Sequence, residues 1–177
     1  MLKAPTVLSL CAVLCLYGCG VHHPKAVTQQ QVVSQLSQPI AAQLVVKTPE
    51  LTVEGTLQRT GPEMFTFGIT SPDQLDGFCI AVEQQTCSIS YGGMEARLHS
   101  KLLPEAFGIV TFNRAVDALL RQQEPSFRNT PEGGAVMEGS LDEAAFQIKF
   151  DSSGRPFLFT LPQYDLTVEW KQNNRQE

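Results

Sequence analysis

The sequence has 177 residues, of which 42% are hydrophobic and 18% are charged, and its formal net charge at pH 7 is -5. A chain of this length and composition can bury one ordinary core, so collagen, a coiled coil and extensive disorder are excluded. Because 18 acidic residues outnumber 13 Lys and Arg residues and no basic cluster occurs, we predict no nucleic-acid surface.

The first residues have the features of a lipoprotein signal peptide. Lys3 precedes an apolar run, residues 7–17, that is too short to span a bilayer. The run ends in Leu16-Tyr17-Gly18-Cys19, which resembles a bacterial lipobox. We therefore expect residues 1–18 to be a signal peptide and Cys19 to carry a lipid anchor on the extracytoplasmic face of the cell membrane. The alternative is that Cys19 is an ordinary cysteine of a leader.

Both ends of the remaining chain are polar. Residues 19–40 contain few large apolar side chains and are predicted to be a flexible tether, and residues 172–177 a frayed C-terminus. His22 and His23 are adjacent but have no neighbouring cluster of ligands, so we predict neither a metal site nor a cofactor.

Period-two alternation of apolar residues predicts strands from residue 41 onward. Turn sequences such as Thr60-Gly61-Pro62-Glu63 separate them, which is typical of an antiparallel meander. The alternating residues are Ala42, Leu44, Val46, Val53, Gly55, Leu57, Phe65, Phe67, Ile69, Phe78, Ile80, Val82, Ile89 and Tyr91.

One segment changes to helical periodicity. Ile109, Phe112, Val116 and Leu119 recur at spacings of three and four, with Asn113, Arg114, Asp117 and Arg121 elsewhere on the helical wheel. Residues 124–134 read as a loop, and strands resume at residues 135–139, 144–150, 157–159 and 165–170. Strands, one helix, then strands predict an α+β fold in which a curved antiparallel sheet packs on one main helix.

Two cysteines lie within the predicted sheet. Cys79 and Cys87 could form a disulfide in an extracytoplasmic compartment. The strand alternation, however, places Cys87 on the inner face and Cys79 on the outer face, which directs their Cβ atoms apart. A β-bulge would be needed to bring the sulfur atoms together, so both states remain open.

Several segments resemble the small bacterial lipoproteins of the LolA/LolB/LppX type. They are Leu57-Gln58-Arg59-Thr60, Met64-Phe65-Thr66-Phe67, Thr70-Ser71-Pro72, Tyr91-Gly92-Gly93-Met94 and the turn from Phe150 to Pro156. The resemblance covers the domain at residues 41–171. It implies an incomplete antiparallel barrel closed by helices, with a hollow between sheet and helix that holds a lipid or a lipoprotein acyl chain.

The leading hypothesis is therefore a membrane-anchored lipoprotein that binds or carries an apolar ligand between the sheet and the helix. The alternative is a structural or interaction module of the cell envelope with a solid core. We expect no enzymatic activity, because no convergent set of catalytic groups occurs in the sequence. The residues predicted to line the ligand site are Phe65, Phe67, Ile69, Phe78, Ile80, Ile89, Tyr91, Phe112, Val116, Phe146, Ile148 and Phe157.

Overall fold

The computed structural model describes residues 26–102, 108–122 and 125–171. The predicted signal peptide, the anchor residue Cys19 and the predicted frayed end at residues 172–177 lie outside the described residues.

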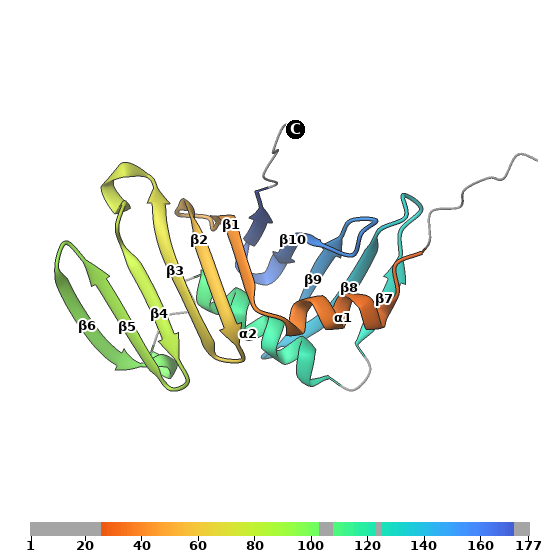
Figure 1. Cartoon of the computed structure of the whole chain (residues 1–177), viewed down its shortest axis with the longest axis horizontal. Helices are drawn as coiled ribbons and strands as arrows, with labels where there is room; N and C mark the ends of the chain where they lie inside the picture. The colour runs from red at the N-terminus through yellow and green to blue at the C-terminus, as the bar shows by residue number, and fades with distance from the viewer. Residues whose placement is uncertain (1–25, 103–107, 123–124, 172–177) are drawn as a thin grey trace, which may run out of the picture.

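The described residues form one open antiparallel sheet with helices against one face (Figure 1). Its 11 strands follow the order β6-β5-β4-β3-β2-β1-β11-β10-β9-β8-β7. The predicted α+β class and the curved antiparallel sheet are thus confirmed. The strands are β1 (Ile40–Lys47), β2 (Thr52–Gly61), β3 (Met64–Ser71), β4 (Cys79–Glu83), β5 (Thr86–Tyr91), β6 (Met94–His99), β7 (Ser126–Asn129), β8 (Ala135–Leu141), β9 (Ala144–Phe150), β10 (Pro156–Leu161) and β11 (Leu166–Trp170).

Two of these strands were not predicted. The structure forms β6 directly after the Gly92-Gly93 turn, in which both glycines have positive φ. It also forms β7 inside the segment 124–134 that the sequence analysis predicted to be a loop. Both strands lie at edges of the sheet, where each pairs on one side only, so their side chains need no strong apolar alternation.

The predicted helix is α2 (Gly108–Arg121), and its four periodic apolar residues are buried. It packs against β8, with further contacts to β11 and β1. The prediction that Asn113 and Asp117 lie away from the buried face of the helix is wrong, because these two residues are only 2% and 3% exposed. A second helix, α1, contacts α2, so α2 is covered on more than its sheet-facing side.

Helix α1 (Gln29–Ser37) corrects the predicted tether at residues 19–40. Thr28 caps its N-terminus by accepting a hydrogen bond from the Gln31 amide at 3.2 Å. Val32 and Leu36 lie one turn apart on the same face and are fully buried, whereas the glutamines at residues 29–31 are exposed. The folded unit therefore begins before residue 40, and residues 26–40 belong to it.

A buried ion pair between Arg59 and Asp117 links α1, α2 and β2. Arg59 on β2 donates to Asp117 on α2 at 2.5 Å and to the Leu36 carbonyl at the end of α1 at 3.2 Å. The second carboxylate oxygen of Asp117 accepts the backbone amide of Glu63 at 2.9 Å. The pair thus fixes the positions of α1, α2 and the β2–β3 turn relative to one another.

Both cysteines of the sheet are free thiols. Cys87 is fully buried and opposes Val82, whereas Cys79 is half-buried and opposes Ser90, so the predicted opposite faces are correct. Burial raises the pKa of the Cys87 thiol above its ordinary value, because an apolar surrounding disfavours the thiolate. Of the two states that the sequence left open, disulfide or free thiols, the structure has the free thiols.

Candidate functional site

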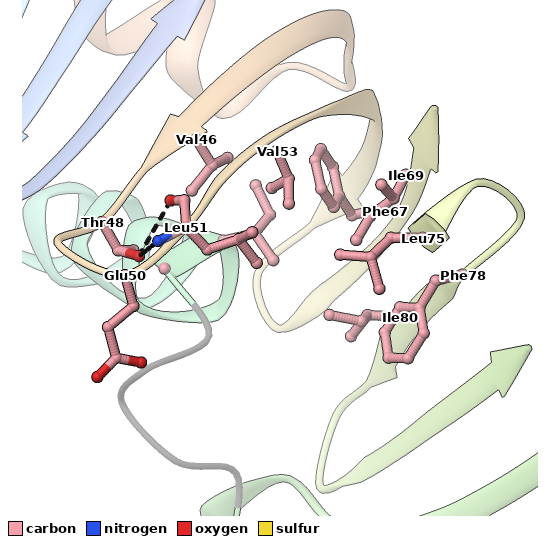
Figure 2. Close-up of a pocket in the computed structure, with 12 residues that line it drawn as sticks. Val46, Thr48, Glu50, Leu51, Val53, Phe67, Ile69, Leu75, Phe78 and Ile80 are labelled. Carbon is pink, nitrogen blue, oxygen red and sulfur yellow. Dashed lines mark hydrogen bonds between the residues drawn. The ribbon is translucent and has the colours of Figure 1, made fainter. Parts of the chain in front are cut away.

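An apolar cavity lies between the inner face of the sheet and the first turn of α2. Its volume is about 270 Å³, and it is open to solvent on one side. Figure 2 shows aliphatic and aromatic side chains from β1, β2, β3 and β4 directed into the same space. The lining residues are Val46, Thr48, Glu50, Leu51, Val53, Phe67, Ile69, Leu75, Phe78, Ile80, Gly108 and Ile109.

The floor of the cavity follows from the strand register. Leu57, Phe67, Ile80 and Ile89 are successive cross-strand partners from β2 to β5, so their side chains form one row on the inner face. Leu57, Phe67 and Ile80 are at most 2% exposed, whereas Ile89 is half-buried. Along this row the cover therefore decreases from β2 to β5, and Phe67 and Ile80 are its two members that line the cavity.

The β1–β2 turn forms one rim. Thr48 closes this turn, because its amide donates to the Leu51 carbonyl at 2.9 Å. Its hydroxyl donates to the same carbonyl at 3.1 Å and accepts the Leu51 amide at 3.2 Å (Figure 2). These bonds hold Leu51 at the cavity although the residue is 45% exposed. An exposed leucine fixed at the mouth offers apolar contact to whatever enters.

The β3–β4 connection forms the opposite rim. The short 3₁₀ helix η2 (Asp73–Leu75) is closed by the Leu75 amide donating to the Pro72 carbonyl at 2.8 Å. The Phe78 amide donates to the Leu75 carbonyl at 2.9 Å, and Figure 2 shows both side chains beside Ile80. This connection therefore places the half-buried side chains of Leu75 and Phe78 at the edge of the cavity, where a two-residue turn would place none.

The structure brings together only part of the predicted site. Phe67, Ile69, Phe78 and Ile80 line the cavity. Ile89 and Tyr91 lie farther along the inner face, with the Tyr91 ring 6.1 Å from that of Phe78.

The other predicted site residues do not line this cavity. Phe157, 37% exposed, lies on β10, and the remaining residues are buried in the core. Phe112 and Phe146 both pack against Phe159, at ring-centroid distances of 5.2 and 5.7 Å, which fills the space under α2. The core residues are Phe65, Phe112, Val116, Phe146 and Ile148.

The sequence does not predict the two rims. Its patterns place Val46, Val53 and Ile109 on apolar faces of strands and helix, but nothing in one strand's alternation tells which part of a face stays uncovered. Leu51 and Leu75 carried a recognisable signal, since each is a lone large apolar residue within a polar turn. This signal is weak, because single apolar residues are common on protein surfaces.

The chemistry of the lining is apolar. Glu50, which is exposed, is its one ionisable group. In the part of the chain that the structure describes, no group of three or more His, Cys, Asp and Glu residues is close enough to hold a metal ion. No helix in the described ranges is long and apolar enough to cross a membrane.

A larger cavity, of about 580 Å³, lies between β1, β10 and β11. Its lining includes Asp151, Arg155 and Lys171 as well as Phe157 and Trp170, so it contains both charged and apolar groups. Size alone favours this cavity, but removing an apolar ligand from water requires an apolar lining. We therefore take the smaller cavity as the candidate site.

Solved structures similar to this chain share little sequence with it. A LolA superfamily protein from Nitrosomonas europaea aligns with 14% identity over 83% of this chain and 79% of that chain, with a TM-score of 0.43. LprF from Mycobacterium bovis aligns with 12% identity over 82% and 89%, with a TM-score of 0.41. A chain in the structure of the CwlD amidase with the GerS lipoprotein, from Clostridioides difficile, aligns with 12% identity over 99% of both chains, with a TM-score of 0.49.

No protein-family model and no curated protein matches the sequence. The structural alignments concern the fold and assign no activity, ligand or partner to this chain. The described residues adopt the curved antiparallel sheet with helices against one face that the sequence predicts, and this sheet is open and is not closed into a barrel.

Proposed function

We propose that this protein is a non-enzymatic, membrane-anchored lipoprotein of the cell envelope that binds an apolar ligand in the cavity between β1–β4 and α2. The observation that supports the proposal is an open cavity with an apolar lining, because a domain with a completely filled core would have no such cavity. Each methylene group that leaves water contributes about 0.8 kcal/mol, so an acyl chain of ordinary length gains enough to bind.

The size of the cavity selects the kind of ligand. Ligand pockets typically measure about 300–1,000 Å³, and this cavity, at about 270 Å³, lies just below that range. A single acyl chain, or one chain of a lipid whose head group stays in solvent, suits such a space better than a complete two-chain lipid. Glu50 at the mouth disfavours an anionic head group held against it.

The test is native mass spectrometry of residues 20–177 after incubation with a total membrane-lipid extract and removal of free lipid. We expect a stoichiometric adduct whose mass identifies the ligand class. Leu75→Glu places a charge in the cavity wall and is expected to abolish the adduct. Phe157→Glu, on the far part of the sheet, is the matched control and is expected to retain it. A folded parent protein without any adduct would contradict the proposal.

The anchor is a separate part of the proposal. Cys19→Ser is expected to abolish incorporation of labelled palmitate and to release the protein from the membrane fraction, since lipidation supplies the membrane affinity. Retention of the variant in that fraction, together with an unlabelled parent protein, would argue against the anchor. It would not affect the proposal that the cavity binds a ligand.

The second candidate function is an interaction module. Large apolar side chains remain exposed at the β5–β6 end of the inner face, where Met94 is 71% and Tyr91 40% exposed. A protein with such side chains and no ligand in its cavity would use this end of the sheet to contact another protein.

A further inference from the structure

The edge strand β6 is complementary to a second copy of itself. In the described residues β6 pairs with β5 on one side and is the last strand of the sheet on the other. An exposed edge strand offers unpaired backbone groups to another strand, which natural proteins usually block with proline, a bulge or isolated charges. Residues 94–99 contain no proline, and their pairing with β5 is regular.

The direction of the backbone groups follows from the ladder with β5. The Ser100 amide donates to the Gln85 carbonyl at 2.7 Å, and the two-residue turn makes Tyr91 and Met94 direct partners. Antiparallel ladders alternate, so the even-numbered residues of β6 direct their backbone groups toward β5. Glu95 and Arg97 therefore direct theirs toward the open edge.

The side chains of the same strand separate into two faces. Met94, Ala96 and Leu98 lie on the inner face, in register with Tyr91, Ile89 and Cys87 of β5. Glu95 and Arg97 lie on the outer face, where their side chains are 47% and 74% exposed and form an ion pair at 2.7 Å. The strand thus has one apolar face and one face with a single charge of each sign.

We infer that β6 pairs antiparallel with β6 of a second copy about a two-fold axis at Ala96. This register places Glu95 of each copy opposite Arg97 of the other, and Met94 opposite Leu98. Glu95 and Arg97 are also the residues whose backbone groups face the edge, so each such pair exchanges both backbone hydrogen bonds. Opposite charges directly across two strands are stabilising.

Other registers fail for stated reasons. A shift by one residue puts the edge-facing groups of Glu95 opposite residues whose backbone groups already bond to β5. A shift by two residues places Glu95 opposite Glu95, or Arg97 opposite Arg97, and like charges directly across strands are destabilising. Two-fold symmetry makes the interface closed, so the pairing yields a dimer and not a filament.

The dimer also extends the surface beside the cavity. The inner faces of the two sheets become continuous across β6, which adds a second set of Met94, Leu98 and Tyr91 side chains to the exposed apolar area. Met94, which is 71% exposed in the single copy, then lies directly opposite Leu98 of the second copy. The inference is independent of whether the cavity binds a lipid.

Sedimentation of the full chain in mild detergent measures the association. We expect a monomer–dimer equilibrium in the parent protein. Arg97→Glu or Glu95→Arg converts both attractive pairs to repulsive ones and should raise the dimer dissociation constant about tenfold or more. The double exchange Glu95→Arg with Arg97→Glu restores opposite charges in the same register and should restore the parent's dissociation constant.

A cysteine scan of the full chain tests the register. Residues at the two-fold axis form a non-hydrogen-bonded pair with Cα atoms about 4.5 Å apart, within disulfide range, whereas the same residue at position 95 or 97 is displaced to about 7–8 Å. Oxidation should therefore link Ala96→Cys copies through residue 96, and Glu95→Cys or Arg97→Cys copies much less. Circular dichroism verifies that each variant is folded.

Three results would overturn the inference. They are a parent protein that stays monomeric at all concentrations, a double exchange that fails to restore association, and equal cross-linking at positions 95, 96 and 97.

Discussion

At the scale of single residues, Arg59 shows how one charged side chain organises the fold. Residues Val53, Gly55, Leu57 and Arg59 alternate on β2, so Arg59 occupies the inner face that its apolar predecessors define. A buried guanidinium requires a partner, and Asp117 of α2 provides it. Both residues could be read from the sequence as members of their elements, but their pairing depends on how α2 crosses the sheet.

Removing one partner of this pair is expected to be costly. Asp117→Ala leaves the Arg59 charge buried without its counter-ion and should lower the free energy of unfolding by about 3–5 kcal/mol. Replacing both partners, with Arg59→Met and Asp117→Leu, should cost clearly less than the sum of the two single changes. Urea denaturation of the four proteins measures this coupling.

The exposed pair of Arg128 and Glu138, at 3.4 Å, provides the matched control. Arg128→Ala should change the free energy of unfolding by at most about 1 kcal/mol, because solvent screens an exposed pair. An Asp117→Ala variant as stable as Arg128→Ala would contradict the stabilising role of the buried pair.

The two thiols should differ in reactivity. Cys79 is half-buried, whereas Cys87 is fully buried and burial raises the pKa of its thiol. Because the thiolate is the nucleophile, iodoacetamide should alkylate Cys79 in the native protein and leave Cys87 unmodified until the protein is denatured. Peptide mass mapping before and after denaturation measures this order, and early labelling of Cys87 would show that the inner face near β5 opens readily.

At the scale of elements, strands with alternating apolar residues could be predicted and those at the edges could not. The alternation in β2 and β3 reflects one buried and one solvated face, which is a property of the strand's own sequence. Helix α1 lacked such a signal, because glutamines dominate it and only Val32 and Leu36 are fully buried. Its burial depends on the site that Arg59 and α2 provide, which no local pattern contains.

Helix α1 is expected to stabilise the domain. Leu36 is 0% exposed, so Leu36→Ala should lower the free energy of unfolding by about 2–5 kcal/mol through lost burial and a residual cavity. Gln30→Ala, at an exposed position of the same helix, should have almost no effect. Thermal unfolding of both variants measures the difference, and equal melting temperatures would support a flexible tether in place of the helix.

At the scale of the whole molecule, the site arises from unequal cover of one sheet. Helix α2 packs mainly on β8 and crosses toward β1 (Figure 1). Aromatic side chains such as Phe112 and Phe159 fill the space beneath it. Beyond β1 the inner face remains equally apolar, but its cover is incomplete and the cavity forms there. The sequence predicted the apolar face correctly, and its division into core and cavity required the position of α2.

The most direct test is methyl NMR of residues 20–177 titrated with a ¹³C-labelled monoacylglycerol, a single-chain lipid whose head group carries no charge next to Glu50. The account predicts nuclear Overhauser contacts between the acyl chain and the methyl groups of Val46, Ile69, Ile80 and Ile109, which line the cavity. Ile148, in the filled core under α2, serves as the internal control and should show none. Contacts at Ile148 in place of the cavity methyls, or no contact with a folded protein at saturating monoacylglycerol, would contradict the account.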